Sequence, residues 1–304
     1  MQRALELAER GRGKVGDHPL VGAVVVADDE VVGEGWYEYD AVEHAETVAL
    51  AQAGDRARGA TMYVTLEPCA HHGRTPPCAD AVAAAGVARV VVGALDPNPK
   101  AAGGVARLRD AAVDVEVADA PEARRQNEAW RTWVELGRPF VTLKLALTLD
   151  NRVRVPGRRW VSGEASRRRV HELRASVDAV AVGMGTVRAD DPRLDARDVG
   201  ATRQPRRIAF GHGDAGELEV LSGGLEDELR ALAAEGVRSL LLEGGPTIAA
   251  SFLDAGLVDK VALFVAPIVA GEGPLGLTAP LELNGVAAER VGEDVLLVGY
   301  IREP

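Results

Sequence analysis

Four residues in the first third of the chain have the types and spacing of a catalytic metal centre. His44 and Glu46 are separated by one residue, and Cys69 and Cys78 follow further along the chain. One imidazole and two thiolates would leave the fourth position of a tetrahedral zinc ion open to water, which is the pattern of catalytic rather than structural zinc. Glu46 is not needed as a ligand, so it is available to carry protons.

This set of residues has the chemistry of hydrolytic deamination. Zinc lowers the pKa of a bound water from ~15.7 to about 7, and Glu46 can move the released proton to a ring nitrogen and then to ammonia. The zinc deaminases combine a His/Cys/Cys site with a glutamate that is not a ligand. A lone His-x-Glu is most often a surface pair, but two cysteines in the right order favour the deaminase interpretation. His71 and His72 are rival ligands that would close the site, and we interpret them as loop or substrate contacts.

Length and composition limit the function classes. The chain has 304 residues, of which 47% are hydrophobic and 27% are charged, and this composition is typical of a soluble protein with two domains. The net charge of -11 argues against a nucleic-acid partner. Residues 1–10 lack the apolar core of an export signal, and the apolar region 256–271 is too short to span a bilayer. We therefore expect a cytoplasmic protein without a membrane partner, in which two thiols bind metal rather than form a disulfide.

The elements around these residues alternate between helices and strands, which predicts a three-layer α/β domain with ligands at the ends of strands and helices. A helix over 41–53 would carry His44 and Glu46 in its first turn, and a strand over 61–66 would deliver Cys69. The other expected elements are a helix over 2–11, a β-hairpin of strands 21–26 and 31–36, a helix over 79–85, and strands over 89–93 and 113–117.

A charged stretch rich in tryptophan divides the chain. We expect a first domain over 1–120, a linking helix over 121–138 and a second domain over 139–304. The second domain is expected to contain strands over 140–147, 178–183, 206–210, 238–242 and 260–267, with helices near 164–175, 225–235 and 246–255.

Several longer motifs carry a resemblance to a known family. They are Tyr63–Cys78, Asp96–Pro99, Arg138–Ala146, Gly183–Pro192 and Glu243–Thr247. Together they resemble the bifunctional deaminase/reductase family of riboflavin biosynthesis over nearly the whole chain. The resemblance implies an α/β protein with a cytidine-deaminase-like three-layer αβα domain, followed by a dihydrofolate-reductase-like α/β domain with a mixed sheet. It implies zinc-dependent deamination of 2,5-diamino-6-ribosylamino-4(3H)-pyrimidinone 5′-phosphate and then reduction of the ribosyl side chain to ribityl by NADPH.

The resemblance also implies roles for individual residues. Zinc would be held by His44, Cys69 and Cys78, with Glu46 as proton donor. Arg174 and Arg197 suit a substrate phosphate because guanidinium binds phosphate in a bidentate manner, although a surface position is the commoner fate of an arginine. The full set implied by the resemblance is Ala146, Trp160, Thr186, Asp190, Gly245, Pro246, Thr247, Ile248, Ala249, Ala250 and Ser251 for the cofactor, and Arg174, Leu194, Arg197 and Glu243 for the substrate. Lys144, on the expected strand over 140–147, is a further substrate candidate that would face the ribose, and a lysine with a buried stem and an exposed head is the alternative.

The turn Glu243-Gly-Gly-Pro-Thr247 joins an apolar strand to a helix. Such a turn fits a backbone-amide cradle for pyrophosphate at a helix N-terminus, and an ordinary strand-to-helix turn fits it equally well. It is not the G-x-G-x-x-G fingerprint of a Rossmann domain.

The chain departs from the family pattern at several binding positions. His18 stands where an asparagine is expected. The family's Gly-basic-Gly segment is shortened to Gly103-Gly104, so its basic residue is missing. In the second half, Arg158 and His212 replace serines, and the segment between Phe210 and Ser239 is much shorter than in the family. Because the metal-binding residues are complete and only binding positions differ, we expect deamination to be retained, and a change in reduction or in substrate identity stays open.

Three other functions remain open at this point. A paralogue would deaminate a related aminopyrimidine phosphate in specialised metabolism, with or without reduction. A zinc-stabilised binding or assembly protein would have no turnover. A nucleic-acid deaminase fits least, because the chain is acidic and has no basic groove lined by aromatic residues. We expect a small pyrimidine nucleotide as substrate, and a homodimer.

Overall fold

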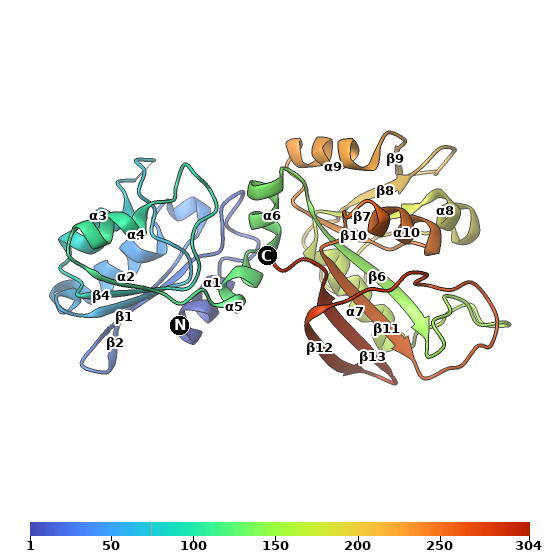
Figure 1. The fold of residues 1–304 in the computed structure, drawn as a ribbon, viewed down its shortest axis with the longest axis horizontal. Coiled ribbons are helices and arrows are strands. Elements are labelled where there is room, and N and C mark those ends of the chain that lie inside the picture. The colour runs from blue at the N-terminus through green and yellow to red at the C-terminus, as the bar shows by residue number, and fades with distance from the viewer. Residues whose placement is uncertain (74) are drawn as a thin grey trace. The chain divides into compact units, whose positions relative to one another are not determined.

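The computed structural model describes residues 1–73 and 75–304 (Figure 1). Arg74, which belongs to the motif Tyr63–Cys78, lies outside the described residues. The chain divides into two compact units, Met1–Leu136 with Pro304, and Gly137–Glu303. Each unit is described by itself.

The first unit is built on a mixed sheet with the strand order β2-β1-β3-β4-β5. β1 pairs with β2 and β3 in an antiparallel manner, whereas β3, β4 and β5 run parallel. The β1–β2 turn is made by Asp28 and Asp29, both with positive φ. The strands are β1 (Gly22–Ala27), β2 (Glu30–Trp36), β3 (Thr61–Val64), β4 (Arg89–Val92) and β5 (Asp114–Val117).

Helices cover both faces of this sheet. Apolar residues of α2, α3 and α4 share one core cluster with one face of the strands, and α1 packs on the other face around Val24. This arrangement gives three layers. The helices are α1 (Gln2–Glu9), α2 (Ala45–Ala53), α3 (Cys78–Ala84), α4 (Gly104–Asp110), α5 (Pro121–Gln126) and α6 (Glu128–Leu136), with short 3-10 turns η1 (Tyr39–Ala41) and η2 (Gly54–Ala57).

Three features differ from the expectation. The helix expected from residue 41 begins at Ala45, so that His44 is its N-cap and Glu46 lies in its first turn. The helix α4 was not expected, because it is short and has glycines at its N-cap and first position. The expected linking helix is two helices, α5 and α6, which meet at Asn127. The Asn127 side chain exchanges two hydrogen bonds with the backbone of Leu20, which ties this segment to the first unit.

The second unit contains a larger mixed sheet with the order β12-β13-β11-β6-β10-β7-β8-β9. The strands from β11 to β9 in this order are parallel, and β13 and β12 add an antiparallel edge. The strands are β6 (Phe140–Thr148), β7 (Ala179–Gly183), β8 (Arg206–Phe210), β9 (Glu219–Leu221), β10 (Ser239–Leu242), β11 (Lys260–Ala266), β12 (Asn284–Val291) and β13 (Asp294–Tyr300).

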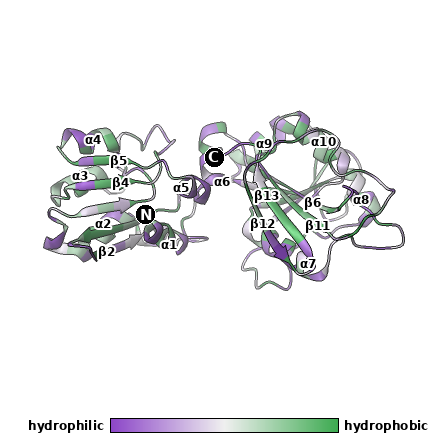
Figure 2. Cartoon of the chain, turned by 60° about the horizontal axis from the view of Figure 1, so that its bottom comes forward, coloured by the Kyte–Doolittle hydropathy of each residue, from purple (hydrophilic) through white to green (hydrophobic). Residues whose placement is uncertain are grey.

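Helices cover this sheet on both faces. Residues of α9 and α10 join the largest core cluster with one face of the parallel strands, whereas α7 and α8 pack against the opposite face. The strands β6 and β11 are strongly hydrophobic (Figure 2), as expected for parallel strands buried on both faces. The helices are α7 (Glu164–Ser176), α8 (Met184–Asp190), α9 (Leu225–Ala234) and α10 (Pro246–Asp254).

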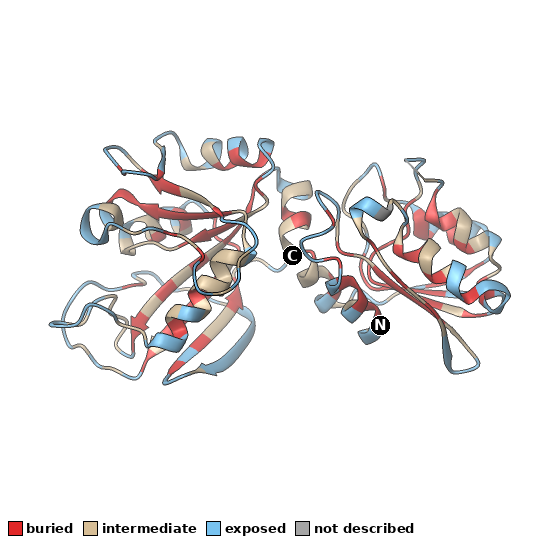
Figure 3. Cartoon of the chain, turned by 180° about the vertical axis from the view of Figure 1, so that it is seen from behind, coloured by how far each residue is buried: buried red, intermediate tan, exposed pale blue. Residues whose placement is uncertain are grey.

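The order of the strands determines where a ligand can bind. From β6 the chain crosses to β7, β8 and β9, then returns to insert β10 between β6 and β7, and later places β11 on the other side of β6. In open α/β sheets, the crevice at the carboxyl ends of the strands beside such a reversal is the usual ligand site. In contrast, the edge strand β12 is exposed along nearly its whole length (Figure 3).

Among the described residues, no helix is both long and apolar enough to cross a membrane.

Candidate active sites

The first unit brings one imidazole and two thiols together. The ligand atoms of His44, Cys69 and Cys78 all lie within 4.8 Å of one another. His44 Nδ1 lies 3.1 Å from Cys78 Sγ and 3.7 Å from Cys69 Sγ. Ligands of a tetrahedral zinc ion at normal bond lengths have nitrogen and sulfur about 3.6 Å apart. The spacing of these atoms therefore fits zinc, and both cysteines are free of a disulfide.

The two cysteines shift each other's pKa in opposite directions. Their mutual hydrogen bond lowers the pKa of Cys69 to about 4 and raises the pKa of Cys78 above its ordinary value. The backbone N–H of Cys78 also donates to Cys69 Sγ at 3.3 Å, which favours the thiolate. Because zinc binds thiolates, the lowered pKa of Cys69 favours the form that a metal ion requires.

Glu46 is buried beside these ligands, with 3% of its surface exposed. Burial raises the pKa of its carboxyl, and the nearby His44 only partly opposes this effect. A raised pKa brings the carboxyl closer to neutral pH, where it can both accept and release a proton. Neither His71 nor His72 belongs to the ligand cluster of the described residues, and both are exposed.

Glycines of β2 hold the helix that carries His44 and Glu46. A Cβ atom on Gly35 would lie 2.1 Å from the Ala45 carbonyl oxygen, and one on Gly33 would lie 2.0 Å from the Ala49 carbonyl oxygen. Any larger residue would push α2 away from the sheet. The close contact of β2 and α2 therefore determines how near to the sheet the N-terminus of α2, with His44, can lie.

Glu67 is a buried residue of the site that the sequence reasoning missed. Its carboxylate accepts hydrogen bonds from the backbone N–H groups of Asp96, Gly103 and Val105, at 3.2, 3.0 and 2.9 Å. It thereby joins the segment before Cys69 to the loop after β4. Burial also raises the pKa of Asp96 to about 6. The signal available in the sequence was the position of an acidic residue directly after a buried strand.

A chain of aromatic contacts leads from His44 to His18. The buried Tyr37 presents its ring edge-on to His44, with centroids 5.6 Å apart. His18 lies against Tyr37 and Tyr39, at centroid distances of 5.3 and 5.5 Å. The histidine that replaces the family's asparagine is therefore one ring removed from the metal ligand.

The second unit contains a cavity of about 1580 Å³ at the carboxyl ends of its parallel strands. Residues 144–146 of β6, 183–184 after β7, 210–212 after β8 and 243–245 after β10 line it, together with one side of α7. This is the place that the strand order predicts. The residues expected to bind ligands that line this cavity are Ala146, Trp160, Thr186, Asp190, Gly245, Pro246, Thr247, Ile248, Ser251, Lys144, Arg174, Arg197 and Glu243.

Three expected binding residues do not line the cavity. The Leu194 side chain is 1% exposed and packs in a core cluster with residues of β7 and β10. Ala249 of α10 is also 1% exposed and packs in the largest core cluster. Ala250, the next residue of this helix, also does not line the cavity. These side chains face away from a ligand because a helix or a turn exposes only part of its residues to one side. Two of the substituted positions, Arg158 and His212, do line the cavity.

A buried ion-pair network organises one corner of the cavity. Arg174 donates from Nε and Nη2 to the Glu243 carboxylate at 2.5 and 3.0 Å, and Lys144 Nζ lies 3.5 Å from the same group. Burial alone would raise the pKa of Glu243, but Lys144 and Arg174 together lower it below its ordinary value. The Arg174 fork is occupied by Glu243, and Arg197 Nη1 is paired with the Asp195 carboxylate, so a phosphate would compete with a carboxylate at either arginine.

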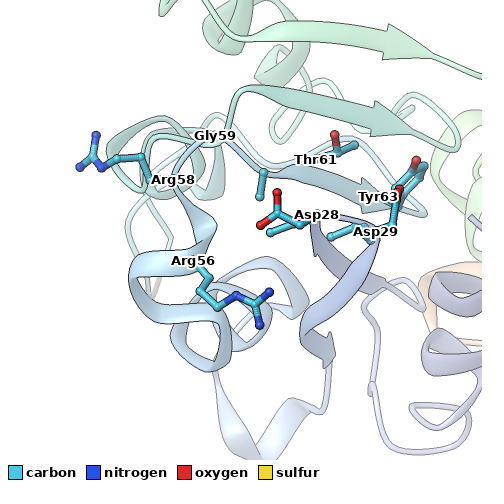
Figure 4. A pocket seen from close by; sticks show the side chains of 10 residues that line it. Asp28, Asp29, Arg56, Arg58, Gly59, Thr61 and Tyr63 are labelled. Atoms are coloured by element: carbon cyan, nitrogen blue, oxygen red, sulfur yellow. The ribbon is translucent and has the colours of Figure 1, made fainter.

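The first unit has a cavity of its own, of about 390 Å³, near the start of β3 (Figure 4). It is lined by Asp28 and Asp29 of the β1–β2 turn, by Arg56, and by Thr61 and Tyr63 of β3. Cys69 follows the carboxyl end of β3, whereas this cavity lies near the start of β3. Its lining includes none of the four residues of the metal centre.

Family models match both units. Residues 1–94 match the cytidine and deoxycytidylate deaminase zinc-binding region, and residues 139–297 match the RibD C-terminal domain. The second match alone covers more than half of the chain. The chain belongs to the RibD family of riboflavin biosynthesis proteins. The unit with the metal-ligand cluster thus corresponds to a deaminase region. The unit with the strand-end cavity corresponds to the reductase domain of RibD.

RibD proteins of known sequence and structure cover almost the full chain. The RibD of Aquifex aeolicus is 38% identical over 346 residues, covering 98% of this chain and 96% of that protein. The RibD of Escherichia coli K12 is 38% identical, covering 91% and 89%. The structure of Acinetobacter baumannii RibD has a TM-score of 0.84 at 34% identity, covering 98% and 97%. The alignment with the Aquifex protein is longer than this 304-residue chain, so the relative has insertions that this chain lacks.

A fourth relative is named by its two activities. A Thermotoga maritima structure described as a diaminohydroxyphosphoribosylaminopyrimidine deaminase/5-amino-6-(5-phosphoribosylamino)uracil reductase has a TM-score of 0.82 and is 34% identical, covering 99% of this chain and 97% of that one. The family resemblance, the fold class, the bifunctional enzyme class in riboflavin biosynthesis and the cofactors zinc and NADPH are confirmed at this level. A small-molecule substrate is consistent with these relatives.

Proposed function

We propose that His44, Cys69 and Cys78 hold zinc and that Glu46 moves protons in the deamination of 2,5-diamino-6-ribosylamino-4(3H)-pyrimidinone 5′-phosphate. The observation that supports this proposal is the convergence of three ligand atoms within 4.8 Å beside a buried glutamate. When bound, zinc supplies the Lewis acidity that makes water a nucleophile near neutral pH. The Glu46 carboxylate accepts a proton from the attacking water and passes it to the ring nitrogen. The same carboxylate then takes the second proton from the hydroxyl group added to the ring and gives it to the leaving amine, so that water and the aminopyrimidine yield a carbonyl and ammonia.

For the second unit, we propose reduction of the ribosyl side chain in the 1580 Å³ cavity. NADPH supplies the hydride when it is bound. The turn after β10 would orient the cofactor, because Gly245 caps α10 and its N–H is held by Thr186 Oγ1 at 3.2 Å. Lys144, Arg197 and Glu243 would orient the sugar phosphate. We retain 1–120, 121–138 and 139–304 as the proposed functional boundaries.

The test measures the two activities separately. The protein is purified with zinc and given the diaminopyrimidine phosphate, and ammonia release and NADPH oxidation are followed in parallel. Both signals are expected, with ammonia appearing first. No ammonia from this substrate would contradict the proposed deamination, whereas ammonia without NADPH oxidation would contradict only the reductase proposal.

A second candidate is favoured by the positions of Arg158 and His212. Both replace expected serines and both line the reductase cavity. A paralogue that deaminates a related aminopyrimidine phosphate, with or without reduction, would have such an altered binding surface. Identification of the product by mass spectrometry separates this candidate from the first.

The remaining proposals concern the setting of the enzyme. The two free thiols of the metal centre suit a reducing compartment, and we propose the cytoplasm. The exposed edge strand β12, with Val286 58% exposed, is consistent with a homodimer. The net charge of -11 supports the absence of a nucleic-acid partner. Sedimentation of the purified protein with and without RNA tests both partner proposals.

A further inference from the structure

The helix α7 presents one stripe of residues to the reductase cavity. Arg167, Val170, His171 and Arg174 all line it, with the spacing of neighbours on one helix face. His171 is partly buried between Arg174 and the loop that follows α8. It is the one residue of this stripe whose side chain can be a neutral hydrogen-bond acceptor.

The backbone determines which nitrogen of His171 carries the proton. His171 Nδ1 lies 3.0 Å from the carbonyl oxygen of Asp195, and Arg174 Nη1 donates to the same oxygen at 3.1 Å. A carbonyl oxygen only accepts, so Nδ1 must be the donor and Nε2 keeps its lone pair. The N–H of Arg197 approaches Nδ1 at 3.4 Å. If Nδ1 accepted this N–H, its lone pair would also face the carbonyl oxygen at 3.0 Å, which is repulsive. The shorter contact with the carbonyl oxygen therefore decides that Nδ1 carries the proton.

The surroundings disfavour the charged ring, and the hydrogen bonds of His171 to the described residues are made at Nδ1 rather than at Nε2. Burial, followed by Arg174, lowers the pKa of His171, and Arg197 adds to the effect while Asp195 opposes it. Within residues 1–73 and 75–304, the hydrogen bonds of His171 are made by Nδ1. The neighbouring Arg174 and Lys144 are donors, and both are engaged with the Glu243 carboxylate. The corner is therefore rich in donors and has a fixed acceptor at Nε2.

We propose that His171 Nε2 accepts a hydrogen bond from a hydroxyl group of the sugar-phosphate part of the substrate. This inference rests on the proposed reductase function and names a substrate contact within it. A sugar phosphate presents anionic oxygens to the cations and hydroxyl groups to an acceptor. The fixed tautomer of His171 would distinguish such a ligand from inorganic phosphate, which has no sugar hydroxyl groups.

Two variants separate the acceptor role from a structural one. In His171→Asn, the amide N–H can replace Nδ1 and donate to Asp195, but nothing replaces Nε2. In His171→Gln, the amide reaches the position of Nε2 and can accept, but the contact with Asp195 is lost. We expect His171→Asn to raise the KM for the deaminated intermediate roughly tenfold, the effect of about one hydrogen bond. His171→Gln should stay within about threefold of the unchanged protein, and ammonia release by the first unit is the internal control.

A binding measurement decides the inference without turnover. Ribose 5-phosphate and inorganic phosphate are each titrated calorimetrically into the full chain and the two variants. His171→Asn should bind ribose 5-phosphate about tenfold more weakly and inorganic phosphate equally well. Equal loss for both ligands, unchanged binding of both, or loss in His171→Gln but not in His171→Asn would overturn the inference. Absence of NADPH oxidation by the unchanged protein would instead contradict the proposed function, and the titration would still decide the role of His171.

Discussion

The two candidate sites of this chain are built on opposite plans. The metal centre of the first unit is small and buried, with Cys78 and Glu46 0% and 3% exposed. The cavity of the second unit has a volume of about 1580 Å³ and takes its lining from four strand ends and several loops. One site depends on three ligand atoms and a proton carrier, and the other depends on a wide surface of charges and backbone groups.

This difference explains how binding positions of the cavity can change while the residues of the metal centre are kept. A tetrahedral metal site tolerates almost no change of ligand. The three proposed ligands and Glu46 are all present in this chain. A large cavity binds through many weak contacts, so single positions such as Arg158 and His212 can change while the fold is kept. The deaminase site should therefore fail completely when one residue is changed, whereas the reductase site should weaken in steps.

The largest expected effect is that of Glu46→Gln. The amide cannot carry the proton, so ammonia release should fall by about 10³-fold, within the range of general acid–base catalysis. Zinc content, measured by atomic absorption, should stay unchanged because Glu46 is not a ligand. Reduction of an externally supplied deaminated intermediate should also be unchanged. Retained ammonia release would show that the buried carboxyl is structural.

Next in size is Glu243→Gln in the reductase cavity. The change leaves Lys144 and Arg174 without their shared carboxylate in a site where these side chains are 15% and 13% exposed. Loss of one partner of a buried charge pair is costly, and we expect NADPH oxidation to fall by roughly 100-fold. Glu235→Gln is the matched control, because Glu235 is 60% exposed in its pair with Arg206. An equal loss in both variants would contradict the role of the buried network.

A smaller effect is expected from Gly35→Ala, which tests how β2 holds α2. The new methyl group would lie 2.1 Å from the Ala45 carbonyl oxygen. Overpacking should lower the free energy of unfolding by about 1–3 kcal/mol, measured by urea denaturation, with a parallel loss of ammonia release. Gly185→Ala is the control, since a Cβ there meets nothing within 4 Å. An unchanged stability of Gly35→Ala would mean that α2 can move without cost.

The smallest effect is a pH dependence of the reductase half. The pKa of His171 lies below its ordinary value of 6.5 because burial and Arg174 disfavour the charged ring. Protonation removes the acceptor, so the KM for the deaminated intermediate should rise severalfold as pH falls through this pKa, and should be constant above it. In His171→Gln this dependence should be absent. The same pH profile in that variant would assign the dependence to another group.

The elements and the metal ligands were largely predictable from local patterns. The order of strands and helices in the first domain followed from alternating apolar runs, and the four residues of the metal centre followed from residue type and spacing. The start of α2 was placed too early, because the apolar pattern continues through the 3-10 turn at residues 39–41. The strands β12 and β13 were not expected, and for β12 the reason is that an exposed edge strand lacks a regular pattern of burial.

Other features depend on contacts between distant residues. The sequence did not reveal that Glu67 would accept three backbone N–H groups, since all three donors lie about thirty residues or more further along the chain. Leu194 matched the family pattern for a substrate contact, yet its side chain lies in the core. The tautomer of His171 depends on one carbonyl oxygen of a loop that the sequence did not place beside α7.

The sequence by itself determined which groups can perform chemistry, because a thiol, an imidazole or a carboxylate has its reactivity wherever it stands. It also determined the two-part family membership, because motifs of this length carry their own information. Only the tertiary structure decided which atoms meet, which are buried and which tautomer is present. These properties depend on distance and solvent exposure, and folding sets both by bringing together residues that are far apart in the chain.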